Sequence, residues 1–327
     1  MESMEFAYNY LCQRDTPRGN RTVPKGSKGG GMQLSKQVQE IRTNWLISDT
    51  KRDEGLTTPE DIRRYDNISY GPYGVENLLD IYVQKCVTKP QATIVNIHGG
   101  GWVYGSKEIY QYYCMSLAQR GFTVVNINYR LAPESRFPSP LEDVNQALSF
   151  LEGNGEKYFA DANNLILIGD SAGAQITSHY AAIFTNKEFE KLFNFRAPNV
   201  QIKALGLNCG KYDAQAINEE GLDTVFFEYI DAIDKEPQKE VLEQLDVFKY
   251  ITDKFPPSFV MSCKNDFLLE NAQPMCDFLK KKGVYSEVKI YGREDQEEIA
   301  HVFHVNIKLP EATRCNDDEC AFFRRFV

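Results

Sequence analysis

The feature that most constrains the fold is the string LILIGDSAG at residues 165–173, which the segment AQITSHYAAIF follows directly. It predicts a buried strand, a G-x-S-x-G turn and a helix, with the Ser171 hydroxyl exposed at the turn. Gly169 and Gly173 flank this serine because side chains there would collide with neighbouring backbone in so sharp a turn. The helix points its free N–H groups at the same spot, so we expect the Ala172 amide to donate to an oxyanion.

From Ile68 onward, short apolar runs alternate with helical stretches, which indicates an α/β fold with a mainly parallel sheet covered by helices. Four of the runs are continuous stretches of Val, Ile and Leu, as expected of strands buried on both faces. The pattern predicts strands at 78–84, 93–97, 123–128, 165–168, 204–208, 258–262 and 286–291, and helices at 109–120, 141–151, 172–184, 272–281 and 317–326.

The chain is expected to divide into four parts. Residues 1–32 are polar and glycine-rich, which predicts a flexible or artificially added segment outside the fold. Residues 33–60 contain an amphipathic helix, and residues 209–256 lack a convincing strand and read as a helical insertion. The catalytic domain then comprises residues 61–208 and 257–327.

A second glycine-rich string, HGGGW at residues 98–102, comes directly after a predicted strand. Consecutive glycines let the backbone approach a substrate oxygen closely and direct N–H groups at it. Gly100 and Gly101 are the expected oxyanion donors, and His98 is expected to shape the loop.

A nucleophilic serine needs a base, and the chain has only four histidines. His98 belongs to the glycine loop, and His179 lies two helical turns after the serine, where it is expected to point away from it. The base is therefore His301 or His304, which both follow the last predicted strand.

The base in turn needs a carboxylate that fixes its tautomer. Asp266 is the best candidate because it follows the predicted strand 258–262 and should project from the same sheet edge as the serine. Glu294, Asp295 and Glu297 are rivals, but they cluster in a solvated acidic run.

Five motifs together resemble the hormone-sensitive-lipase-type branch of the α/β-hydrolases. They cover about residues 70 to 310 in the order of that family: HGGGW, YRLAPE followed by Phe137-Pro138, GDSAG, Asp266-Phe267-Leu268 and His301-Val302-Phe303.

The resemblance implies a serine carboxylesterase that acts on short to medium acyl esters through an acyl-enzyme and needs no cofactor. It implies a helical cap built from the N-terminal helix and the insertion. His301 matches the family pattern H-G-F with Val302 in place of glycine, so His301 is the expected base and His304 the alternative. The YRLAPE run and Asp143 would be structural.

Two other functions stay open. An amidase or formamidase would use the same triad, and a non-catalytic small-molecule receptor on the same fold would not need it. The chain keeps a residue at every triad position, which argues against the receptor.

The net charge of the chain and the pattern of its cysteines limit which partners and metals it is expected to bind. The net charge of −9 and the pI of about 5.2 argue against nucleic acid. No apolar run approaches the roughly 20 residues of a membrane span, and the N-terminus lacks signal-peptide features, so we expect a cytoplasmic protein.

Eight scattered cysteines without a CxxC pair predict reduced core residues and no metal site. The expected partner is a small-molecule ester, and a homodimer stays open.

Overall fold

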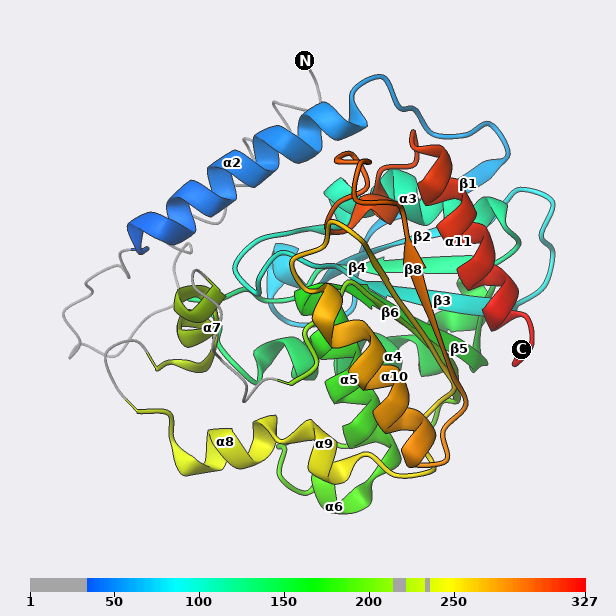
Figure 1. Ribbon diagram of the computed structural model, residues 1–327. Coiled ribbons are helices and arrows are strands. Elements are labelled where there is room, and N and C mark those ends of the chain that lie inside the picture. Colours follow the sequence, from blue (N-terminus) through cyan, green and yellow to red (C-terminus); the bar gives the residue numbers. More distant parts are fainter. Residues whose placement is uncertain (1–33, 214–221, 233–235) are drawn as a thin grey trace, which may run out of the picture. The chain divides into compact units, whose positions relative to one another are not determined.

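The computed structural model describes residues 34–213, 222–232 and 236–327 (Figure 1). The chain divides into two units with the boundary after Gly55. The described part of the first unit contains helix α2 (Lys36–Asp53). The Ser35 hydroxyl caps this helix by accepting the Val38 N–H at 3.3 Å, and two basic residues in its last turn complement the negative end of the helix dipole.

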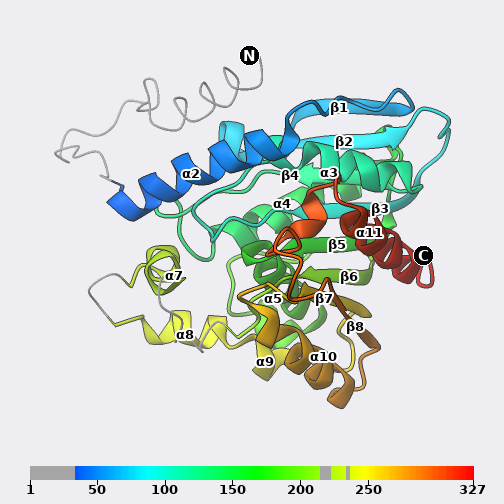
Figure 2. The same ribbon diagram turned by 45° about the horizontal axis from the view of Figure 1, so that its top comes forward.

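The second unit is built on an eight-stranded sheet in the order β1-β2-β4-β3-β5-β6-β7-β8, which can be followed from one edge to the other in Figure 2. β1 and β2 pair antiparallel with their neighbours, and all other pairs are parallel. The strands are β1 (Ile62–Ser69), β2 (Leu78–Gln84), β3 (Gln91–Ile97), β4 (Thr123–Ile127), β5 (Ala160–Asp170), β6 (Ile202–Asn208), β7 (Ser258–Cys263) and β8 (Ser286–Tyr291).

Helices flank this sheet on both sides (Figure 1). Among the described residues, no helix is both long and apolar enough to cross a bilayer. The helices of this unit are α3 (Lys107–Gln119), α4 (Ser139–Asn154), α5 (Ala172–Thr185), α6 (Lys187–Glu190), α7 (Leu222–Ile230), α8 (Lys239–Leu245), α9 (Val247–Tyr250), α10 (Ala272–Lys281) and α11 (Pro310–Phe323), with single 3₁₀ turns η1 (Gly74–Asn77), η2 (Gly155–Tyr158), η3 (Leu269–Asn271) and η4 (Phe303–Val305).

The predicted α/β class and mainly parallel sheet are confirmed, and all seven predicted strands form. The prediction missed β1, whose sequence IRRYDNIS is largely polar because this strand lies at the sheet edge, where charged side chains are common. The last helix begins at Pro310 and not at residue 317 as predicted. Proline at the first helical position is a start signal that the sequence reading overlooked.

One face of the sheet packs against α3 and α11. Residues of the inner strands, among them Ile94, Ile166 and Phe259, form a buried cluster with Tyr113 of α3 and Phe323 of α11. Burial on both faces explains why these strands read as continuous apolar runs. Because the strands from β3 to β8 are parallel, their carboxyl ends meet at one edge, and the predicted site residues follow those ends.

A buried ion pair braces the loop after β4. Arg130 Nε donates to both carboxylate oxygens of Asp143, at 3.0 and 2.9 Å, and Asp143 is fully buried. The Arg130 guanidinium also lies 3.9 Å from the ring centroid of Tyr73. Removing either partner would leave an uncompensated buried charge, so this pair fixes the loop in one conformation.

A second buried acid, Glu319 of α11, lies behind the Ser171 turn. Its carboxylate accepts a hydrogen bond from Asn208 Nδ2 at 2.9 Å, and the Asn208 carbonyl accepts the Ser171 N–H at 2.9 Å. Burial raises the pKa of Glu319 from 4.5 to about 7, although the bond from Asn208 acts in the opposite direction. The acid therefore contacts the residue that holds the turn.

Glu319 should make stability fall as the pH rises. Between about pH 4.5 and 7 the folded state binds more protons at this site than the unfolded state, so stability decreases through that window and the loss persists above it. Glu319→Gln removes this titration. We expect its free energy of unfolding, relative to the wild type, to rise by about 2–3 kcal/mol between pH 5 and 8 in urea titrations. Glu152→Gln, an exposed control on α4, should show no such trend, and a trend of equal size there would contradict the assignment.

Candidate active site

The candidate nucleophile lies in a strained turn between β5 and α5. Ser171 adopts φ 52° and ψ −120°, a conformation that L-residues rarely take. A Cβ on Gly169 would lie 2.3 Å from the Gly173 carbonyl oxygen, and a Cβ on Gly173 would lie 2.1 Å from that of Ile97. The predicted reason for both glycines is thus confirmed. Ala172 is the first residue of α5, so helical hydrogen bonding does not use its N–H.

The glycine loop after β3 packs directly against this turn. A Cβ on Gly99 would lie 2.4 Å from Asp170 Oδ2, and a Cβ on Gly100 would lie 2.2 Å from the Tyr104 carbonyl oxygen. Gly100 and Gly101 also have positive φ angles, of 119° and 57°. At Gly100 only glycine satisfies both the spacing and the backbone conformation.

His98 shapes the start of this loop, as expected. Its ring is fully buried and stacks on Tyr129 with centroids 4.1 Å apart. The Tyr129 hydroxyl donates to the His98 carbonyl at 2.8 Å, and the Gly99 N–H donates to the Tyr110 hydroxyl at 3.1 Å. These contacts fix the loop from beneath.

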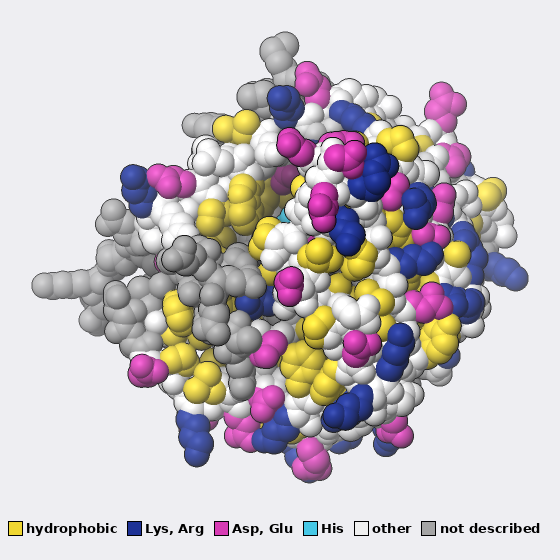
Figure 3. Space-filling view, in the orientation of Figure 1, with side chains coloured by type: hydrophobic (Ala, Val, Ile, Leu, Met, Phe, Trp, Pro, Cys, Tyr) yellow, Lys and Arg dark blue, Asp and Glu magenta, His cyan; other side chains and the backbone are white. Residues whose placement is uncertain are grey.

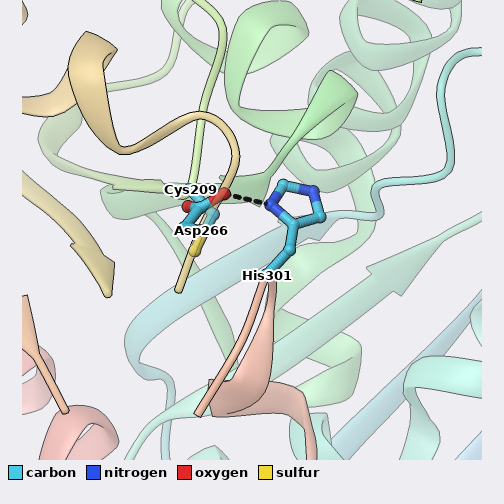
Figure 4. Close-up of side chains that lie close together, drawn as sticks. All are labelled: Cys209, Asp266 and His301. Atoms are coloured by element: carbon cyan, nitrogen blue, oxygen red, sulfur yellow. Dashed lines mark hydrogen bonds and ion pairs between the residues drawn. The ribbon is translucent and has the colours of Figure 1, made fainter. Parts of the chain in front are cut away.

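The candidate acid and base are hydrogen-bonded to each other. Asp266 follows β7 and His301 follows β8, and their Oδ1 and Nδ1 atoms lie 2.7 Å apart (Figure 4). A parallel bridge between Asn265 and Ala300 aligns the two loops that carry them. His301 is thereby oriented through Nδ1, which leaves its Nε2 for other chemistry.

Asp266 is held ionised in a buried position. Burial by itself raises the pKa of its carboxyl, but hydrogen bonds from His301, Ser262 and the Leu268 N–H outweigh burial, and the net pKa is below the usual value. The Ser262 hydroxyl donates at 2.6 Å and the Leu268 N–H at 2.9 Å. A fixed anion beside Nδ1 is what stabilises an imidazolium.

The structure separates the two candidate histidines. His304 lies in η4, almost completely buried, with its ring edge against Tyr113 at 5.2 Å between centroids. Between them, Val302 adopts φ 56° and ψ 28°. This left-handed conformation accounts for the glycine in the H-G-F pattern, and it turns the chain so that His301 and His304 point to different surroundings.

The rival acids lie in an exposed run of the chain. Glu294, Asp295 and Glu297 are exposed, and Asp295 pairs with Arg293 Nε at 2.9 Å. They form the solvated run that the sequence indicated.

Cys209 is a neighbour that the sequence reading treated only as a core residue. It follows β6, and its Sγ lies together with Asp266 and His301 ligand atoms, all within 4.8 Å of one another (Figure 4). Burial raises the pKa of this thiol well above its usual value, so it stays protonated. Because the other two atoms already share a short hydrogen bond, we interpret the group as an acid–base pair beside a neutral sulfur. The position of Cys209 directly after a predicted strand was the sequence signal that could have placed it at the site.

The glycine loop has a second support that the sequence did not reveal. Trp102 Nε1 donates to Gln175 Oε1 at 3.1 Å, and Gln175 Nε2 lies 3.1 Å from His179 Nδ1. Burial lowers the pKa of His179 to about 3, so this ring is neutral and can accept at Nδ1. His179 does not act on the serine, but it orients the amide that holds Trp102.

Helix α7 covers the other side of Trp102. The ring of Tyr229 stacks on Trp102 with centroids 5.2 Å apart, and Phe226 meets it edge-on at 5.3 Å. The Tyr229 carbonyl accepts the Phe137 N–H at 2.8 Å. Part of the insertion is therefore packed onto the loop that carries the candidate oxyanion donors.

Comparisons with known proteins agree with this arrangement. The model of the BD-FAE family matches residues 79–280, which is more than half of the chain. Esterase LipC of Mycobacterium tuberculosis (strain ATCC 25618 / H37Rv) is 27% identical over 216 residues, which cover 63% of this chain and 53% of LipC. The chain spans about half the length of the curated relatives it matches.

Solved structures share the fold. Esterase B from Lactobacillus rhamnosis (HN001) matches with a TM-score of 0.78 at 22% identity, covering 89% of this chain and 95% of that one. An esterase from the bacterial hormone-sensitive lipase family matches with a TM-score of 0.67 at 20% identity, covering 100% and 98%. The α/β-hydrolase fold expected from the sequence is confirmed.

The support of Trp102 can be tested at Gln175. Gln175→Met keeps the size of the side chain but leaves the buried Trp102 N–H without its acceptor, which costs about 1–2 kcal/mol. If this loosens the glycine loop, labelling of Ser171 by a fluorophosphonate probe should slow by about 5- to 30-fold. Labelling of Gln175→Met at the wild-type rate would contradict this role of Gln175.

Tyr180→Phe is the matched control for Gln175→Met. It removes another buried hydrogen bond of α5, from the Tyr180 hydroxyl to Asn145 Oδ1 at 2.8 Å. Its labelling rate should not change. Equal slowing in both variants would show that loss of helix stability, and not the Trp102 contact, explains the effect.

Proposed function

Because the chain belongs to the BD-FAE family, we propose that it is a carboxylic-ester hydrolase with Ser171 as nucleophile, His301 as base and Asp266 as acid. The observation that carries this proposal is the 2.7 Å hydrogen bond between Asp266 and His301, at the sheet edge where the Ser171 turn also lies. The chain order of serine, acid and histidine is that of α/β-hydrolases.

The first half of the proposed reaction forms an acyl-enzyme. His301 Nε2 takes the proton of the Ser171 hydroxyl as its oxygen attacks the ester carbonyl, and Asp266 stabilises the imidazolium that results. His301 then gives this proton to the alcohol oxygen, and the alcohol leaves. In the second half, His301 activates a water molecule that attacks the acyl-enzyme and releases the acid.

The negative oxygen of each tetrahedral intermediate would accept hydrogen bonds from Gly100, Gly101 and Ala172. The supporting observations are the positive φ angles of both glycines and the place of Ala172 at the start of α5. The positive end of the helix dipole lies there and adds to the stabilisation. These donors are backbone groups held by the fold, so they need little reorganisation during the reaction.

The proposed substrates are small esters with short to medium acyl chains. In support, the rings of Trp102, Phe226 and Tyr229 pack together beside Gly101. All three side chains are buried, so they form an apolar boundary on this side of the site. We further propose that the insertion 209–256 acts as a cap over this side of the site.

Ser171→Ala tests the nucleophile directly. The variant keeps a Cβ in the same backbone conformation, so it should fold, while its turnover of p-nitrophenyl butyrate falls by at least about 10⁴-fold. Ser149→Ala, at an exposed position of α4, should hydrolyse this ester at the wild-type rate. Retention of activity in purified Ser171→Ala protein would refute the proposal.

Asp266→Asn tests the acid. Without the anion, the tautomer of His301 is no longer fixed and its imidazolium is no longer stabilised, so kcat should fall by about 10³- to 10⁴-fold. Because the pKa of Asp266 is below its usual value, the carboxylate stays charged over the working pH range of the wild type. The loss of kcat in the variant should therefore be of similar size across that pH range, since no pH restores the anion beside His301.

Asp295→Asn is the control for this variant. Asp295 lies in the same part of the sequence as His301 but is exposed and paired with Arg293. Its pH profile should equal that of the wild type. A loss of kcat here, with a normal Asp266→Asn variant, would move the acid to the rival position.

A further inference from the structure

Phe267 is a large apolar side chain that stays 57% exposed beside the candidate base. Single exposed hydrophobic residues are common, so this exposure alone decides nothing. What distinguishes Phe267 is its contact, because its ring centroid lies 4.3 Å from that of His301 with an interplanar angle of 44°. In Figure 3, part of a histidine side chain is visible among hydrophobic side chains on the face drawn.

The local backbone holds Phe267 in this outward position. Asp266 Oδ1 accepts the Leu268 N–H at 2.9 Å, and the Asp266 carbonyl accepts the Leu269 N–H at 3.0 Å. Asp266 and Leu268 are both buried, so the residue between them is directed outward. The turn that fixes the acid therefore also fixes the ring beside the base.

The chemistry of the proposed reaction places the alcohol part of the ester at the same location. His301 must hand its proton to the departing alcohol oxygen, so that oxygen comes within about 3 Å of Nε2. Atoms bonded to the oxygen then lie within reach of a ring that already touches the imidazole. The acyl part, by contrast, is joined to Ser171 and remains there after the alcohol leaves.

We propose that Phe267 forms an apolar wall of the leaving-group subsite, so that the protein prefers esters of aromatic or other bulky apolar alcohols. The inference rests on the proposed ester hydrolysis and adds to it the class of alcohol. An aromatic leaving group gains ring contact with Phe267 during acylation, whereas an ethyl group is too small to cover the ring. The discrimination concerns acylation, since both esters of one acid give the same acyl-enzyme.

The test compares benzyl butyrate with ethyl butyrate, which differ only in the alcohol. The wild type should show the higher kcat/KM for the benzyl ester. In Phe267→Ala, kcat/KM for the benzyl ester should fall by about three- to tenfold, as expected for loss of one aromatic contact. The kcat/KM for the ethyl ester should change by less than about twofold. Phe267→Tyr keeps an aromatic ring and should retain the preference for the benzyl ester.

Ile290→Ala is the matched control, because Ile290 is another exposed apolar residue and lies on β8. It should leave both kcat/KM values unchanged. Equal losses on both esters in Phe267→Ala would overturn the inference, since Phe267 would then act on His301 and not on the alcohol. No loss on either ester would overturn it as well. If the wild type hydrolyses neither ester, the proposed function is refuted, and this inference with it.

Discussion

The site depends on the close approach of α5 to the end of β3. A Cβ on Gly173 would lie 2.1 Å from the Ile97 carbonyl oxygen, and a Cβ on Gly99 would lie 2.4 Å from Asp170 Oδ2. The two glycine motifs therefore depend on each other, because a side chain at Gly173 or at Gly99 would push the serine turn and the glycine loop apart. The two strings act as one packing unit that sets where a substrate carbonyl would lie.

Two buried carboxylic acids, Asp266 in the site and Glu319 behind the Ser171 turn, show how hydrogen bonding determines charge. Asp266 and Glu319 are both buried, and burial is the largest single influence on the pKa of each. Asp266 has three donors around it, and its net pKa is lowered, whereas Glu319 has the Asn208 amide as its nearest donor and a pKa of about 7. The anion is thus kept beside His301, where an imidazolium would form, and the acid behind the Ser171 turn is readily protonated.

The sequence could predict those parts of the site that local motifs encode. The strand, the turn glycines and the positions of Ser171 and Asp266 follow from short patterns, because each pattern reflects a backbone requirement at that place. Residue type and spacing left both His301 and His304 as candidates, and the resemblance to the family pattern H-G-F favoured His301. In the structure the two histidines lie in one loop but have different surroundings. Contacts such as those of Gln175 with Trp102 and of Phe267 with His301 join separate elements, so no spacing rule announces them.

Backbone strain is concentrated where the chemistry is proposed. Seven non-glycine residues have a positive φ among those that the structure describes, and four of them border the site: Trp102, Ser171, Cys209 and Val302. A positive φ costs a non-glycine residue about 1–2 kcal/mol, so the surrounding fold must over-determine these positions. At Ser171 and Cys209 the parallel strands do so, because each of these two residues directly follows a strand end whose register neighbouring strands fix. Motifs can therefore name the residues of the site, whereas their conformations are set by the whole sheet.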